Sequence, residues 1–201
     1  LSGVESTHYS VDGGTEQTGT KVSLSAEGTH DVTYYSVDRA GNAGAMKNFV
    51  VKIDKTAPTI SHALSPEPNT NGWNKADVTV TFTCGDQAGL SGLKSCTPPV
   101  TVDEDVTGRV VDGLAEDNAG NTATSHATVN LDTKVPTITG SRAPEANAYG
   151  WNNSGVTVHF EASDNLGGSG IASLTDDETF GEGTAQSLTG TAVDLAGNTA
   201  R

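Results

Sequence analysis

Apolar and polar residues alternate strictly in several short stretches of the chain. In residues 78–84, Val78, Val80 and Phe82 are apolar and every residue between them is a threonine. Residues 156–162 repeat the pattern, with His159 and Glu161 on the polar side. A period of two with one polar face is typical of antiparallel strands that cover a core on one side. These stretches therefore predict strands, and no long helix-forming run competes with them.

Turn residues separate the alternating stretches. The motif Asp-x-Ala-Gly-Asn stands between two alternating segments, for example between 111–115 and 127–131, and predicts a hairpin there. The run Val11-Asp12-Gly13-Gly14 predicts another hairpin, because Gly and Asp readily adopt the conformations that tight turns need. The chain is therefore expected to be all-β.

Four landmarks recur along the chain with one shared period, which is the separation in sequence of Trp73 and Trp151. They are Asp-x-Ala-Gly-Asn at 38–42, 117–121 and 194–198, Asp-x-x-x-Pro at 54–58 and 132–136, Gly-Trp-Asn at 72–74 and 150–152, and the strands 78–82 and 156–160. One shared period indicates a repeated unit. Its length suits one small β-sandwich per repeat and is too long for a solenoid coil.

The recurring prolines mark the joints between repeats, because proline ends strand pairing. The expected units are 1–55, a variant that lacks its N-terminal strands, 56–133, a complete unit, and 134–201, which lacks its last strand. Aligning Leu1-Ser2-Gly3 with Leu90-Ser91-Gly92 supports this phase, and we expect an internal fragment of a longer protein.

The charge balance narrows the classes of partner. The chain of 201 residues carries 25 Asp and Glu against 11 Lys and Arg, for a net charge of −14. Nucleic acids and anionic membrane surfaces require clustered cations, so both are disfavoured. No apolar run approaches the 18 residues that would predict a membrane span.

The two cysteines indicate a disulfide. Cys84 falls on the inward phase of its strand, and Cys96 follows after a short intervening segment. One period on, the aligned residues are Ala162 and Leu174, both apolar. Joint replacement by hydrophobic residues favours a core-facing disulfide over a metal site or a reactive thiol. A disulfide would also place the protein in an oxidising compartment.

The Asp-x-Ala-Gly-Asn motif has two interpretations. The plain one is a turn, in which Asp and Asn accept backbone hydrogen bonds. The alternative is calcium, because Asp and Asn oxygens lie near acidic residues at the joints. The spacing is not that of an EF-hand loop, and Arg39 intrudes in the first copy. The candidate calcium ligands are Asp38, Asn42, Asp54, Asp117, Asn121, Asp132, Asp194 and Asn198.

Trp73 and Trp151 each follow a glycine and precede an asparagine near the start of a strand. An exposed tryptophan can stack on sugar rings, which makes both candidate carbohydrate-binding residues. The competing interpretation is an apolar plug at the end of a sandwich, a frequent place for tryptophan.

Catalysis has little support in the sequence. The five histidines lie at non-equivalent positions, and no zinc-protease, serine-hydrolase or nucleotide-binding motif occurs. We expect no catalytic residues, no cofactor other than calcium, and no enzymatic activity.

In combination, these motifs resemble the bacterial immunoglobulin-like repeats of secreted and cell-surface proteins. The resemblance rests on Asp-Lys-Thr-Ala-Pro, Gly-Trp-Asn-Asn, the Ser-Gly-Ile or Ser-Gly-Leu of mid-repeat and the closing Asp-x-Ala-Gly-Asn, and covers nearly the whole chain. It implies tandem immunoglobulin-like antiparallel β-sandwiches, often appended to extracellular hydrolases, and carries over no catalytic residue.

The expected function is that of a non-catalytic, extracellular or cell-surface spacer, stalk, fibre or adhesin segment. Two alternatives stay open: a module that binds carbohydrate or a host surface, and an accessory region of a secreted glycoside hydrolase or protease. The expected partners are the rest of a larger extracellular protein, a cell-wall or host glycan, or further copies that build a fibre.

Overall fold

The computed structural model describes residues 2–201, and Leu1, which the sequence aligns with Leu90, lies outside the described residues. Strands and loops make up this part of the chain, as the alternation predicted, and it contains no helix. It follows that no helix of the described part could cross a membrane. The chain is therefore all-β.

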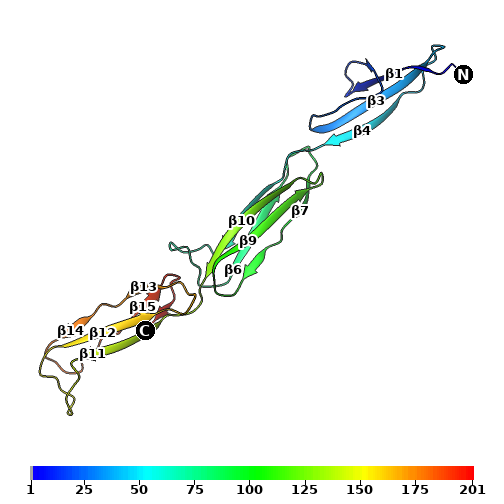
Figure 1. Cartoon of the computed structure of the whole chain (residues 1–201). Coiled ribbons are helices and arrows are strands. Elements are labelled where there is room, and N and C mark those ends of the chain that lie inside the picture. The colour runs from blue at the N-terminus through cyan, green and yellow to red at the C-terminus, as the bar shows by residue number, and fades with distance from the viewer. Residues whose placement is uncertain (1) are drawn as a thin grey trace. The chain divides into compact units, whose positions relative to one another are not determined.

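The N-terminal strands form one antiparallel sheet of order β2-β1-β3-β4 (Figure 1). Its strands are β1 (Val4–Val11), β2 (Gln17–Thr18), β3 (Gly28–Asp38) and β4 (Lys47–Ile53). The predicted hairpin turn joins β1 to β2, where Asp12 and Gly13 have φ of 53° and 68°. Val32, near the middle of β3, is buried.

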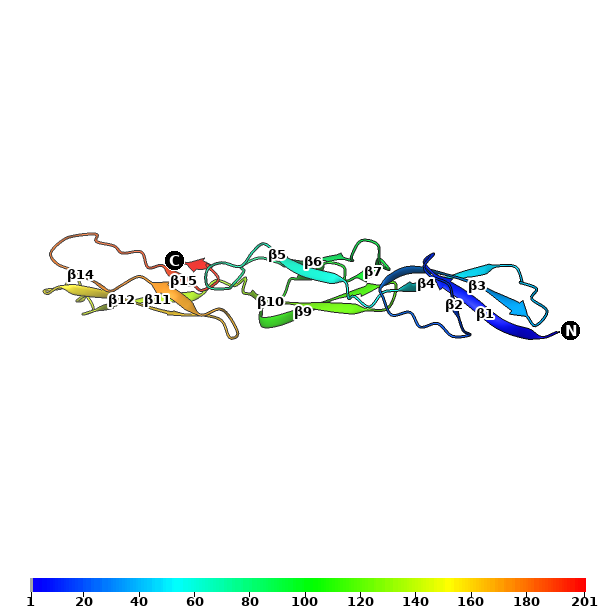
Figure 2. The same ribbon diagram turned by 90° about the horizontal axis from the view of Figure 1, so that it is seen from above.

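Residues 59–131 form two three-stranded sheets, of order β5-β6-β8 and β10-β9-β7. Their strands are β5 (Thr59–Ser65), β6 (Val78–Gly85), β7 (Leu93–Cys96), β8 (Val100–Val102), β9 (Val106–Asp117) and β10 (Thr122–Leu131). Neighbours β9 and β10, which flank the predicted turn at 117–121, run side by side (Figure 2).

Residues 137–200 form two more three-stranded sheets, of order β11-β12-β14 and β13-β15-β16. Their strands are β11 (Thr137–Ala143), β12 (Val156–Ser163), β13 (Ile171–Leu174), β14 (Glu178–Phe180), β15 (Ala192–Asp194) and β16 (Thr199–Ala200). No sheet of the described chain includes residues 54–58 or 132–136.

By internal contacts the chain divides into two compact units, the first of residues 1–61, 83–97 and 114–124 and the second of residues 62–82, 98–113 and 125–201. The first holds the four-stranded sheet and the disulfide. The core of the second is built by fully buried side chains that include Val78, Val80, Val102, Val129 and Leu131. The alternating residues of β6 therefore face a core as predicted.

Candidate functional site

Three carboxyl groups meet where β4, β6 and β9 end. Asp54 and Asp86 directly follow β4 and β6, and Asp117 is the last residue of β9. One oxygen of each lies within 4.8 Å of the others, and Asp117 is fully buried. We call these three residues the first cluster.

A second cluster has the same construction. Asp132 and Asp164 directly follow β10 and β12, and Asp194 is the last residue of β15. Their oxygens also lie within 4.8 Å of one another, and Asp132 and Asp194 are 0% and 1% exposed. Each residue stands about one sequence period after its counterpart in the first cluster.

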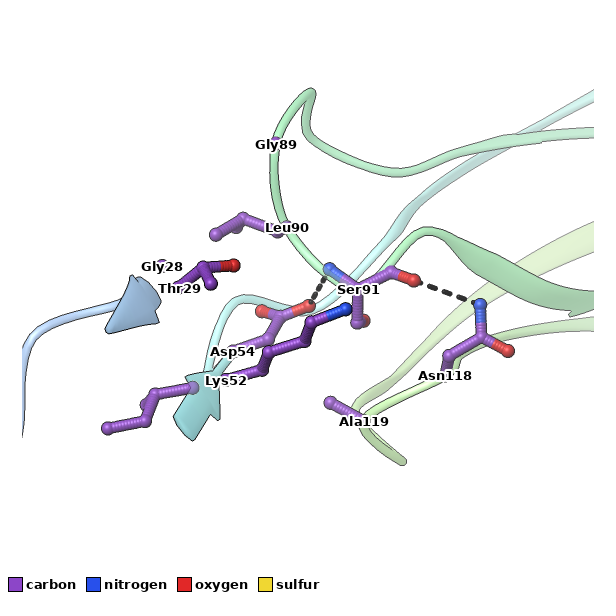
Figure 3. Close-up of a pocket in the computed structure, with 10 residues that line it drawn as sticks. Gly28, Thr29, Lys52, Asp54, Gly89, Leu90, Ser91, Asn118 and Ala119 are labelled. Atoms are coloured by element: carbon purple, nitrogen blue, oxygen red, sulfur yellow. Dashed lines mark hydrogen bonds between the residues drawn. The ribbon is translucent and has the colours of Figure 1, made fainter. Parts of the chain in front are cut away.

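Backbone amides hold the carboxyl groups in the same way in both clusters. In the first, Asp54 accepts bonds from Thr56 N (3.0 Å) and Ser91 N (2.9 Å), and Asp86 accepts one from Gly92 N (2.7 Å). Figure 3 shows the bond from Ser91 to Asp54, beside a shallow pocket of about 350 Å³ that Lys52 also lines. The carboxyl groups are thus fixed before any ligand arrives.

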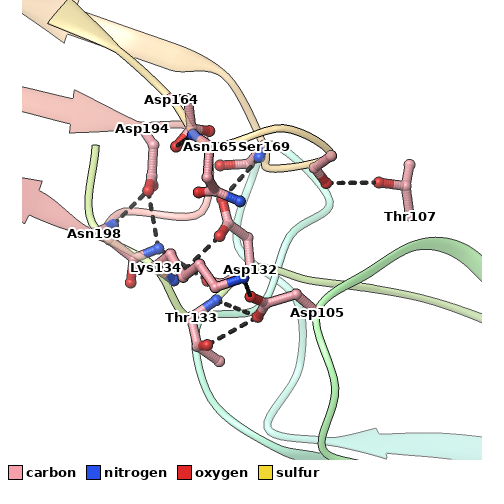
Figure 4. Close-up of polar contacts among 11 residues, drawn as sticks. Asp105, Thr107, Asp132, Thr133, Lys134, Asp164, Asn165, Ser169, Asp194 and Asn198 are labelled. Carbon is pink, nitrogen blue, oxygen red and sulfur yellow. Dashed lines mark hydrogen bonds and ion pairs between the residues drawn. The ribbon is translucent and has the colours of Figure 1, made fainter. Parts of the chain in front are cut away.

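In the second cluster the donors are the residues one period later. Asp132 accepts bonds from Lys134 N (3.2 Å) and Ser169 N (2.7 Å) (Figure 4). Asp164 accepts one from Gly170 N. Two clusters with matching donors indicate one recurring local geometry and not a chance crowding of acids.

The motif asparagines position the aspartates. Asn121 donates from its backbone N (2.8 Å) and from Nδ2 (2.8 Å) to Asp117, and from the same Nδ2 to the carbonyl of Asp54 (3.3 Å). Asn198 donates likewise to Asp194, and to the carbonyl of Asp132 (2.8 Å). Because their side-chain amide nitrogens donate to the aspartates, these asparagines hold the aspartates in position and do not serve as oxygen ligands.

Buried oxygen atoms without a partner accompany each cluster. They are Asp86 Oδ1 and Gln87 Oε1 beside the first, and Asn165 Oδ1 beside the second. Gln87 and Asn165 stand one sequence period apart, each directly after the middle acid of its cluster. A buried acceptor without a donor is costly unless something positive binds it.

Two carboxyl groups of the first cluster, those of Asp54 and Asp117, have a pKa below the usual value. Burial and the charge of Asp54 oppose ionisation of Asp117, but the hydrogen bonds from Asn121 and Ala119 outweigh them, so its pKa lies below the usual value. The pKa of Asp54 is lowered foremost by the Ser91 side chain, and also by the amides of Ser91 and Thr56. The site thus gathers negative charge that a cation would neutralise.

Carboxylate and amide oxygens at this density suit a hard divalent cation. Calcium takes six to eight oxygen ligands from carboxylates, amide groups, carbonyls and water. Asp54, Asp86 and Asp117, or Asp132, Asp164 and Asp194, would hold the ion, with Gln87 or Asn165 as a further oxygen ligand. No cysteine or histidine belongs to either cluster, which makes a zinc site a poor fit.

The sequence predicted four of these six acids. It missed Asp86 and Asp164, which stand outside the recurring motifs, although their separation by one full period was a readable signal. Asp38 and Asn42 form the predicted turn, with Asn42 Nδ2 donating to Asp38 Oδ2 at 3.0 Å. Within residues 2–201, no cluster of three acids includes Asp38.

The disulfide between Cys84 and Cys96 is present, with a Cα–Cα distance of 5.9 Å. It connects the end of β6 to the end of β7, and both side chains are half-buried. The two tryptophans differ from each other: Trp73 is half-buried, whereas Trp151 is 60% exposed and lines a groove. The plug interpretation therefore does not describe Trp151.

Comparison with known proteins adds no family: no family model matches the chain, and no curated protein matches it.

Proposed function

We propose that this chain is a non-catalytic, extracellular segment of tandem immunoglobulin-like β-sandwich repeats that acts as a structural spacer or surface-fibre segment and binds one calcium ion at each acidic cluster. The observation that carries the proposal is the pair of matching clusters, Asp54-Asp86-Asp117 and Asp132-Asp164-Asp194. The repeated landmarks support tandem repeats, and the disulfide and acidic surface fit an extracellular setting.

In this proposal calcium would join segments of the chain that lie far apart in the sequence. Asp54 lies in the segment between β4 and β5, while Asp86 and Asp117 close the far ends of β6 and β9. An ion shared by the three would tie that segment to both strand ends, and Asp132 stands in the same relation to Asp164 and Asp194. A spacer that must keep its form outside the cell gains from such ties at extracellular calcium concentrations.

Calorimetric titration of the calcium-stripped chain with calcium tests the proposal. We expect two binding sites and a melting temperature that rises with calcium. At a calcium concentration one hundred times Kd, the gain is about 2.7 kcal/mol per site. Asp117→Asn and Asp194→Asn should each reduce the stoichiometry from two to one.

Asp38→Asn is the matched control, because Asp38 occupies the same motif without two further acids around it. This variant should keep both sites. A chain whose melting temperature is the same in calcium and in chelator would refute the calcium part of the proposal.

The carbohydrate-binding alternative draws on the exposed Trp151 and on the neighbouring Tyr149, which is 88% exposed. Glycan-array binding that is lost in Trp151→Ala or Trp73→Ala would favour that function over a spacer. A glycan-binding chain could still carry calcium, so the two experiments answer separate questions.

A further inference from the structure

The disulfide lies close to two acids of the first cluster. Cys84 belongs to β6 and stands two residues before Asp86. Its partner Cys96 belongs to β7 and lies opposite Ala115 of β9. Ala115 in turn stands two residues before Asp117. Each end of the bridge is therefore anchored two residues away from an acid of the cluster.

The bridge connects two different sheets. β6 belongs to the sheet β5-β6-β8, and β7 belongs to the sheet β10-β9-β7. Asp86 directly follows a strand of the first sheet, whereas Asp117 ends a strand of the second. The disulfide holds the Cα atoms of Cys84 and Cys96 at 5.9 Å. It therefore limits how far the two acids can move apart.

The bridge also encloses the loop that completes the site. The segment between the two cysteines includes Gln87, the candidate amide ligand. At the other end of this loop, Ser91 N donates to Asp54 at 2.9 Å. Gly92 N donates to Asp86 at 2.7 Å. Closing a loop removes many of its open conformations, so fewer of them compete with the conformation that binds the ion.

The acids need such a restraint, because like charges repel one another. Three carboxyl groups, each with an oxygen within 4.8 Å of the others, favour an opened site as long as no cation neutralises them. Calcium must reverse that opening when it binds. A site that is held closed in advance avoids this cost and binds its ligand more tightly.

The second cluster has the same strand geometry without a bridge. Ala162 of β12 stands two residues before Asp164. Leu174 of β13 lies opposite Ala192, which stands two residues before Asp194. The chain has two cysteines, and both are used at the first cluster. The two clusters thus match in their acids and differ in their covalent restraint.

We propose that Cys84 and Cys96 are positioning residues for the calcium ion of the first cluster, and that their disulfide raises the calcium affinity of this site. The inference rests on the proposed calcium binding. The second cluster has no bridge, so its affinity does not depend on the redox state. Because coupling between two events is reciprocal, bound calcium makes the disulfide harder to reduce by the same factor.

Reduction supplies the first test, and the calcium Kd of each site is measured by calorimetry on the full chain. Asp194→Asn leaves only the first site, and Asp117→Asn leaves only the second. A dithiol transfers two electrons to the bridge, which becomes two thiols while the dithiol closes to a disulfide. We expect reduction to weaken calcium binding at the first site about tenfold, within the usual range for coupled events. The second site should keep its Kd.

A variant without the bridge provides a second form of the same comparison. Cys84→Ala with Cys96→Leu, in the Asp194→Asn chain, should bind calcium as weakly as the reduced chain does. Circular dichroism establishes that both forms are folded. Equilibration of the Asp194→Asn chain with a dithiol and its disulfide gives the reciprocal measurement. Calcium should shift the ratio of bridged to reduced chain about tenfold toward the bridged form.

Moving the bridge tests the inference in the opposite direction. Ala162→Cys with Leu174→Cys places the bridge at the second site. Cys84→Ala with Cys96→Leu removes it from the first site in the same chain. The dependence on reduction should then move to the second site, which is measured alone with Asp117→Asn.

Three outcomes would count against the inference. An equal Kd before and after reduction at the first site would overturn it and leave the calcium proposal intact. A similar loss on reduction at both sites would also overturn it, because the second site has no bridge to break. An oxidised chain that binds no calcium at either site would refute the calcium proposal and this inference together.

Discussion

The ring of Phe82 lies directly against Gly113, so that a Cβ on residue 113 would sit 2.3 Å from ring atoms Cδ1 and Cε1. Phe160 and Gly190 repeat this contact at 2.4 Å. Both glycines are buried and neither has a positive φ, so it is space and not backbone conformation that requires glycine there. In the N-terminal sheet the aligned position is Tyr34, whose ring packs against that of Phe49 in a tilted arrangement with the ring centroids 5.9 Å apart.

We therefore expect Gly113→Ala to destabilise the fold by about 1–3 kcal/mol, the usual cost of overfilling a packed core. Urea unfolding measures the change, and Phe82→Leu in the same chain should recover part of it. Gly181→Ala is the control, because a Cβ there meets no atom within 4 Å. Equal destabilisation by both alanines would show that the contact is unimportant.

The disulfide should stabilise its neighbourhood by about 3 kcal/mol, because it closes a short loop in the unfolded chain. The double variant Cys84→Ala with Cys96→Leu adopts the residue types of the later copy, Ala162 and Leu174. We expect it to remain folded and to unfold at lower denaturant concentration than the oxidised parent. Reduction of the parent should lower the denaturant midpoint of unfolding by a comparable amount. A midpoint that is unchanged by reduction would contradict the prediction.

The turn closed by Asp38 should survive strong acid. Hydrogen bonds from the side chain and backbone of Asn42 lower the pKa of Asp38 to about 2. A lowered pKa contributes stability that is present above the unfolded value of 3.8 and is lost as the pH falls through about 2. Carboxyl titration by NMR should place the midpoint near 2, and Asn42→Ala should move it toward 3.8. Asn48→Ala, whose amide bonds Asp31, should leave it in place.

His30 should show the opposite dependence. The hydrogen bond with Asp12, at 2.8 Å, raises the pKa of His30 above 6.5. The stability that it contributes is present below pH 6.5 and is lost as the pH rises through the raised pKa. In an NMR titration, Asp12→Asn should lower the His30 midpoint, while Glu16→Gln, which removes the partner of His8, should not.

The strand pattern was predictable because it depends on short-range alternation. Residues 78–84 gave β6 as expected, and the turn at Asp117 joins β9 to β10. The hairpin after Val11 was also correct, although β2 comprises only Gln17 and Thr18. Each of these features is encoded within a few neighbouring residues, and so is the chemistry of a turn.

Features that depend on long-range packing were harder to predict. Nothing near Asp86 marks it as a partner of Asp54 and Asp117, because only folding brings three strand ends together. The different exposure of Trp73 and Trp151 escaped prediction for a similar reason. Each follows a glycine and precedes an asparagine, so the residues next to them in sequence do not distinguish the two.

The loop between Cys84 and Cys96 also limits how far the chain can be drawn out. An unfolded chain extends by about 3.5 Å per residue, but the covalent bridge spans only 5.9 Å between the two Cα atoms. Under a pulling force the residues inside the bridge stay slack, and the fully stretched protein is shorter by about 36 Å than its reduced form. The stretched length of this chain under load should therefore depend on the oxidation of this one bridge, and a single-molecule force trace would measure the difference.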